Sequence, residues 1–123
     1  MPRPTHFEIN AKDLAKVTAF YRSVFDWKIE KWDGPMDYWL VGTGEDSSRG
    51  IDGAIFNSEG LFMGTVNTVE VPNLEAYIAR VQANGGQPIG DIQAIPGIGR
   101  FTYCKDVEGN LFGLMENEPG AQS

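Results

Sequence analysis

The chain has 123 residues, of which 41% are hydrophobic and 22% are charged, the composition of an ordinary globular domain. Its formal net charge is −7, and its lysine and arginine side chains are interleaved with acidic ones. Nucleic-acid backbones and anionic membrane surfaces attract concentrated cationic side chains, so we expect neither as a partner. This length fits one domain with one hydrophobic core.

No apolar stretch approaches the ~20 residues that span a bilayer, and the first residues lack the apolar run of a signal peptide. The single cysteine, Cys104, cannot form an intramolecular disulfide. We therefore expect a cytoplasmic protein, although one unpaired cysteine is also compatible with a secreted protein that has no disulfide.

The first half of the chain predicts a strand, a helix and three further strands. Polar and apolar residues alternate over 6–10, which predicts a strand with Phe7 and Ile9 on one face. The other face of this strand then carries His6, Glu8 and Asn10. Asp13 is a suitable N-cap for a helix whose apolar stripe packs on Phe7 and Ile9. Strands follow at about 27–32, 38–41 and 51–56.

The second half repeats this order about sixty residues later. Residues 66–71 predict a strand, Asn73 caps a helix, and the Asn-Gly-Gly segment at 84–86 ends that helix. Strands follow at about 88–92, 100–104 and 111–116, with a hairpin turn at 106–110. The tail at 119–123 is expected to fray.

The two halves predict an α+β fold built from two βαβββ repeats, at about 5–56 and 65–116, within a single domain over 1–123. In each repeat the helix covers one face of the sheet and leaves the other face bare. We expect the two repeats to form a curved mixed sheet around a cleft, with the helices on its outer face.

Several segments in a fixed order carry a resemblance to a known superfamily. They are 6–9, 13–14, 20–21 and 25–27 in the first repeat, and 83–86 and 103–114 in the second. In this order they resemble the vicinal oxygen chelate superfamily, which includes glyoxalase I, bleomycin-resistance proteins and extradiol dioxygenases. Residues 95–101 and 112–114 are most similar to a branch related to lactoylglutathione lyase. The resemblance implies a glyoxalase-like fold and a homodimer.

Metal-binding members of this superfamily take four ligands from the first and last strands of the two repeats. The resemblance and the sixty-residue offset place these positions at His6, Gly53, Val66 and Gly113. Only His6 has a side chain that can coordinate a metal. We therefore expect no metal site, no cofactor and no metal-dependent glyoxalase or dioxygenase activity. A weak site of one histidine with carboxylates such as Glu8 and Glu70 stays open as the alternative.

The bare faces of the two first strands predict a polar wall of the cleft. Its residues are Glu8, Asn10, Thr68 and Glu70, with His6 beside them. We interpret this wall as a recognition surface for a small molecule, and the alternative is a solvated sheet face. His6 has an ordinary pKa near neutrality, so either His6 or Glu70 is a candidate general base. The alternative for His6 is an inert, hydrogen-bonded remnant of a metal-ligand position.

Three further side chains are candidate ligand-binding residues. Trp39, together with Trp32 and Tyr38, could form a flat aromatic wall, or belong to the core. Arg100 could bind an anionic group of the ligand or pair with Glu8 or Glu70, and the alternative is a surface or salt-bridge role. Tyr103 could donate a hydrogen bond in the cleft or belong to the core.

These observations predict a protein of the glyoxalase and bleomycin-resistance type that binds a small molecule between its repeats, without the usual metal centre. One alternative is a lyase- or isomerase-type enzyme with His6 or Glu70 as the base. The other alternative is a noncatalytic partner module. The sequence leaves open whether the protein is an enzyme.

Overall fold

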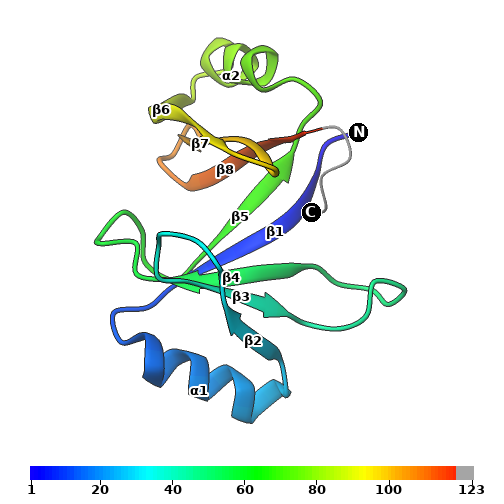
Figure 1. Ribbon diagram of the computed structural model, residues 1–123. Helices are drawn as coiled ribbons and strands as arrows, with labels where there is room; N and C mark the ends of the chain where they lie inside the picture. Colours follow the sequence, from blue (N-terminus) through cyan, green and yellow to red (C-terminus); the bar gives the residue numbers. More distant parts are fainter. Residues whose placement is uncertain (119–123) are drawn as a thin grey trace. The chain divides into compact units, whose positions relative to one another are not determined.

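The computed structural model describes residues 1–118. Across these residues the chain forms eight strands and two helices, in the order βαβββ and then βαβββ again (Figure 1). It divides into two compact units, which we call the first unit (His6–Val66) and the second unit (Met1–Thr5 and the chain from Asn67 onward). The predicted α+β class with two βαβββ repeats is confirmed. The tail expected to fray lies outside the described residues.

The first unit contains one helix and four strands. They are β1 (Arg3–Asn10, in this unit from His6 on), α1 (Leu14–Phe25), β2 (Lys28–Lys31), β3 (Tyr38–Gly42) and β4 (Asp52–Phe56). The strands are hydrogen-bonded in the order β2-β3-β4-β1, with β1 parallel to β4 and the other neighbours antiparallel. Asp13 caps α1 as predicted, because its carboxylate accepts a hydrogen bond from the backbone N–H of Lys16.

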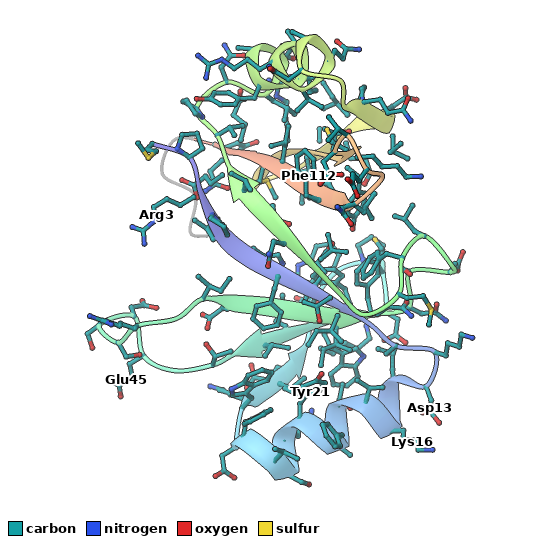
Figure 2. The ribbon with its side chains drawn as sticks, turned by 180° about the vertical axis from the view of Figure 1, so that it is seen from behind. Arg3, Asp13, Lys16, Tyr21, Glu45 and Phe112 are labelled. Atoms are coloured by element: carbon teal, nitrogen blue, oxygen red, sulfur yellow. The ribbon has the colours of Figure 1, made fainter. Side chains whose placement is uncertain are left out.

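The hydrophobic core of the first unit lies between α1 and one face of its strands. The buried strand residues of this core are Ile9, Ile29, Val41 and Ile55. Tyr21 extends from α1 toward the strands (Figure 2), and its ring stacks on that of Trp27 with the centroids 5.3 Å apart. Burial of each aliphatic side chain of this kind contributes roughly 1.5–3 kcal/mol. The core therefore holds α1 on the face that carries Phe7 and Ile9.

The second unit repeats this arrangement with longer final strands. Its elements are β5 (Thr65–Glu70, in this unit from Asn67 on), α2 (Leu74–Ala83), β6 (Gln87–Ile95), β7 (Gly99–Lys105) and β8 (Leu111–Asn117). The hydrogen-bonding order is β5-β8-β7-β6, with β5 parallel to β8. Asn73 caps α2 as predicted. The core beneath α2 contains Leu74, Cys104 and Leu114.

The strand registers correct one predicted equivalence between the repeats. Gly53 lies opposite Phe7 and therefore on the face that α1 covers. Gly113 lies opposite Thr68, on the face that α2 leaves uncovered. The residue that corresponds to Gly113 in register is Ala54, opposite Glu8. The predicted equivalence of Gly53 with Gly113 is therefore wrong, because one residue of offset turns a strand position to the other face.

Candidate functional site

The face of the first unit opposite α1 is called here the polar face. On β1 and β4 it carries His6, Glu8 and Asn10, which lie opposite Asp52, Ala54 and Phe56 respectively. On β3 it carries Tyr38 and Leu40. Phe7 and Ile9 pack in the core on the other side, so the alternation predicted for 6–10 places three polar side chains of β1 together.

A chain of hydrogen bonds joins three side chains on this face. The Tyr38 hydroxyl donates to Oε2 of Glu8 at 2.7 Å, and Nε2 of His6 lies 3.1 Å from the same hydroxyl oxygen. Glu8 is only 5% exposed, which is unusual for a carboxylate. The residue that links them is Tyr38, for which the sequence leaves open an aromatic wall or a place in the core. Strand alternation predicts that Tyr38 and Trp39 point to opposite faces of the sheet. No pattern in the sequence indicates the hydrogen bonds of Tyr38.

The protonation of His6 follows from its surroundings. Burial lowers the pKa of His6 below its ordinary 6.5, and this effect exceeds the opposite influence of the Glu8 and Asp52 carboxylates. The imidazole is therefore neutral near pH 7, and a neutral imidazole offers one nitrogen lone pair as a base or hydrogen-bond acceptor.

Asn10 has a structural contact in this arrangement. Its Oδ1 accepts hydrogen bonds from the backbone N–H of Ser58 at 2.9 Å and from the Ser58 hydroxyl at 2.7 Å. These bonds attach the segment after β4 to the end of β1. The carbonyl oxygen of the Asn10 amide is thus engaged within the first unit.

The second unit has its own uncovered face, opposite α2. Thr68 is 1% exposed, and its hydroxyl has no hydrogen-bond partner within residues 1–118. Glu70 accepts a hydrogen bond from Nδ2 of Asn117 at 2.8 Å. The Tyr103 ring contacts Phe101 edge-on, with the centroids 4.6 Å apart. Thr68, Glu70 and Tyr103 thus lie on the uncovered face, as the strand alternation predicts.

Trp39 lies on the covered face of its unit. Its ring packs against the core beneath α1, and its indole N–H donates to the Asp37 carboxylate at 2.9 Å. The guanidinium of Arg22 lies 5.8 Å from the centre of the ring. The structure therefore does not bring Trp39 to the polar face beside His6, because successive strand residues point to opposite sides.

Arg100 also lies on a covered face. Its guanidinium binds Glu75, in the first turn of α2, with Nη2 2.6 Å from Oε1, and it binds Glu116 with Nη2 3.0 Å from Oε2. Glu116 in turn accepts a hydrogen bond from the backbone N–H of Leu74 at 2.8 Å. These contacts lower the pKa of Glu75 to about 2, mainly through the hydrogen bonds from Arg100. Arg100 therefore has the salt-bridge role given as its alternative, with Glu75 and Glu116 as its partners in place of Glu8 or Glu70.

The donor set does not fit the metal centre that the resemblance implies. Within residues 1–118 no group of three or more His, Cys, Asp or Glu side chains could hold a metal ion. At Gly113 the Phe101 ring occupies the space beside the backbone, since an added Cβ would lie 2.7 Å from Cε2 of that ring. Ala54, the corresponding position in the first unit, carries no donor atom.

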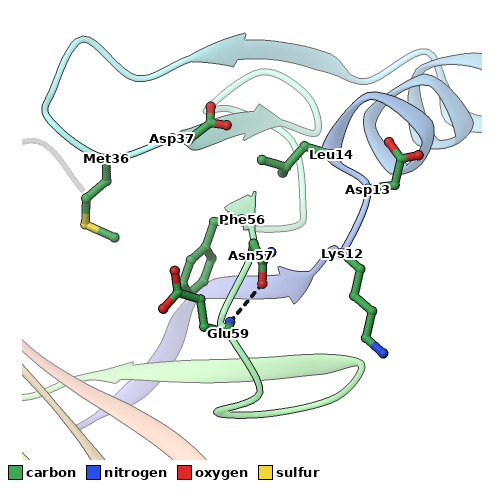
Figure 3. A pocket seen from close by; sticks show the side chains of 8 residues that line it. All are labelled: Lys12, Asp13, Leu14, Met36, Asp37, Phe56, Asn57 and Glu59. Atoms are coloured by element: carbon green, nitrogen blue, oxygen red, sulfur yellow. Dashed lines mark hydrogen bonds between the residues drawn. The ribbon is translucent and has the colours of Figure 1, made fainter.

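A pocket of about 670 Å³ opens in the first unit near the ends of β1 and β4 (Figure 3). It is lined by Lys12, Asp13, Leu14, Met36, Asp37, Phe56, Asn57 and Glu59. None of the eight predicted site residues lines it. It adjoins the polar face through Phe56, whose ring centroid lies 5.2 Å from that of Tyr38.

The two βαβββ units, each with one helix on one face of a mixed sheet, define a class of α+β protein with paired repeats. The chain belongs to the Glyoxalase/Bleomycin resistance protein/Dioxygenase superfamily, whose family model matches residues 3–114. Within the described residues, neither helix is long and apolar enough to cross a membrane.

Individual relatives agree with this assignment. A glyoxylase-like domain-containing protein from Didymella fabae is 28% identical, over 92% of this chain and 91% of its own. A hypothetical protein from Bacillus halodurans C-125 has a similar structure, with a TM-score of 0.74, 16% identity and 99% of both chains covered. Methylmalonyl-CoA epimerase from Mycobacterium tuberculosis is similar with a TM-score of 0.70 and 14% identity, over 94% of this chain and 88% of its own. At these identities the solved structures show a shared fold.

Proposed function

We propose that this protein binds a small molecule on the polar face of the first unit, without the metal centre usual in its superfamily. The observation that carries this proposal is the buried Glu8 carboxylate, which Tyr38 links to His6. Burial of an ionised carboxylate costs several kcal/mol before compensation by hydrogen bonds. Carboxylates are rarely buried to this degree, so a buried carboxylate with a fixed hydrogen-bond partner on a sheet face is a candidate recognition group. The alternative, a solvated sheet face, would leave Glu8 exposed.

The surroundings of Glu8 support binding of an organic molecule. Leu40 is 43% exposed on the same face and offers apolar surface, beside the packed side chains of Ala54 and Phe56. Small-molecule sites typically combine apolar walls with a few fixed polar groups. The polar face has both parts, and Tyr38 contributes to each of them.

Thermal unfolding of the untagged protein with a panel of small metabolites tests this proposal. A ligand at 100 times its Kd stabilises the folded state by about 2.7 kcal/mol and raises the Tm. We expect saturable stabilisation by at least one compound, and its loss in His6→Ala and Glu8→Gln. Glu45→Gln, in the exposed loop before β4 (Figure 2), is the matched control and retains binding. Binding that persists unchanged in Glu8→Gln would contradict the proposed site.

A second candidate function is an isomerase- or lyase-type enzyme with His6 as the base. The lowered pKa of His6, caused by burial, favours it, because a neutral imidazole can accept a proton near pH 7. Glu70 is the weaker candidate, since its carboxylate accepts a hydrogen bond from Asn117. The structural neighbours include methylmalonyl-CoA epimerases, which are isomerases.

Hydrogen exchange distinguishes this enzyme from a binding protein. Incubation with methylmalonyl-CoA in deuterated water, followed by NMR, measures proton removal at the carbon between the two carbonyl groups. Exchange that requires His6 would support an isomerase, and no exchange would reject methylmalonyl-CoA as its substrate. A noncatalytic partner module is indicated if neither exchange nor ligand binding is found. We also propose a homodimer, on the family resemblance, and light scattering should then give twice the chain mass. A cytoplasmic location is proposed because the single cysteine cannot form an intramolecular disulfide.

A further inference from the structure

We infer that Tyr38 holds His6 as its Nε2–H tautomer, so that Nδ1 accepts a hydrogen bond from a ligand that is a neutral or cationic N–H or O–H donor. This inference rests on the proposed binding role of the polar face, and it deepens that role by naming the ligand class. Tyr38 acts as a positioning residue, because it sets which nitrogen of His6 carries the lone pair.

The direction of the hydrogen bonds follows from the number of donors. Tyr38 has one hydroxyl hydrogen, and its hydroxyl is the donor in the bond to Oε2 of Glu8. The bond of 2.7 Å to Glu8 uses that hydrogen. The Tyr38 oxygen then acts as an acceptor toward Nε2 of His6 at 3.1 Å, so Nε2 carries the imidazole hydrogen.

Nδ1 of His6 is consequently the nitrogen with the lone pair. A neutral imidazole has one N–H and one acceptor nitrogen. Within residues 1–118 the hydrogen bond to Tyr38 is the one that His6 makes, and Nδ1 has no partner. The His6 side chain is half-buried, so a ligand on the polar face can approach this acceptor.

The charged groups around His6 indicate which charge the ligand carries. Glu8 on β1 and Asp52 on β4 are the carboxylates that act electrostatically on His6, and Tyr38 faces it from β3. The basic residue on the same face, Lys28 on β2, pairs with Glu30 at 3.6 Å. Two carboxylates beside a neutral imidazole disfavour an anion and favour a neutral or cationic donor.

NMR tests the tautomer directly, because the chain contains one histidine. Long-range ¹H–¹⁵N spectra of the untagged protein at about pH 8 should show a single form, protonated on Nε2. In Tyr38→Phe we expect both tautomers in exchange. Tyr77→Phe, on α2, has the same chemical change away from His6 and should keep the single form. Protonation on Nδ1 in the wild type, or an unchanged spectrum in folded Tyr38→Phe, would overturn the tautomer assignment.

Three planar probes of one size test the ligand class: benzamidine, benzamide and benzoate. Titration against the His6 resonances should give a saturable shift for benzamidine and benzamide, at least tenfold tighter than for benzoate. Tighter binding of benzoate, or no binding of the three probes, overturns the ligand class. The tautomer result is independent of any ligand, so its failure is distinguishable from failure of the proposed binding function.

Discussion

The hydroxyl group of Tyr38 on β3 reaches across β4 to the carboxylate of Glu8 on β1, at a distance of 2.7 Å. The strand between them presents Ala54 on this face, opposite both Leu40 and Glu8. A methyl side chain leaves the space that the tyrosine ring needs to cross a whole strand. The bond thus connects residues thirty positions apart in the chain and fixes the centre of the polar face.

Replacement of Tyr38 by phenylalanine should destabilise the protein by about 1–3 kcal/mol, because it removes a hydrogen bond from a buried carboxylate. Urea unfolding near pH 7 measures this cost. The cost should shrink in a Glu8→Gln background, since a neutral amide is cheaper to leave buried than a carboxylate. An equal cost in both backgrounds would show that the hydroxyl does not act through Glu8. Tyr77→Phe is the control, with an expected change below about 0.5 kcal/mol.

Because of His6, the free energy of unfolding should decrease as pH is lowered from 6.5 to the lowered pKa of the folded protein. Burial lowers the pKa of His6 in the folded state, so the unfolded chain binds the proton more tightly. The contribution is fully present above 6.5 and is lost as pH falls through the lowered pKa of the folded protein. Urea unfolding between about pH 7.5 and pH 5 measures it, relative to His6→Gln, which should lack this step. A parallel pH dependence in wild type and His6→Gln would contradict the expectation.

Replacement of Arg100 by glutamine should raise the pKa of Glu75 from about 2 toward its ordinary 4.5. The pKa of Glu75 is low mainly because Arg100 donates hydrogen bonds to its carboxylate. In the wild type this contribution to stability is present above pH 4.5 and is lost as pH falls toward about 2. A ¹³C NMR titration of the carboxyl groups reads the shift. Ligand binding on the polar face should stay unchanged in Arg100→Gln. Loss of binding in this variant would show that Arg100 contributes to the ligand site.

The substitution Gly113→Ala should destabilise the second unit by about 1–3 kcal/mol, because the added methyl group overpacks its surroundings. The new Cβ would lie 2.7 Å from the Phe101 ring and 2.8 Å from the Thr68 hydroxyl oxygen. Gly42→Ala is the matched strand control, because its nearest neighbour would be the Lys28 carbonyl oxygen at 3.7 Å. Thermal unfolding compares the two variants. Equal Tm values in the two variants would show that the Phe101 ring moves aside without a measurable loss of stability.

The local pattern of the sequence was sufficient for most of the fold. Alternation over 6–10 predicts which residues of β1 share a face, and Asp13 and Asn73 predict the starts of both helices. These features depend on neighbours within four residues, where the periods of strands and helices hold without reference to the rest of the chain. The repeat adds topology, because two similar segments adopt the same βαβββ order.

The centre of the candidate site depended on the tertiary structure. Register across strands depends on loop lengths and on packing, so Gly53 lies one position away from where the repeat placed it. The pairing of Tyr38 with Glu8 and His6 likewise joins residues that no local period relates. The sequence by itself determined which polar side chains lie on the uncovered strand faces. Only the tertiary structure decided which of them contact one another, because such contacts require strands that are distant in the chain to lie side by side.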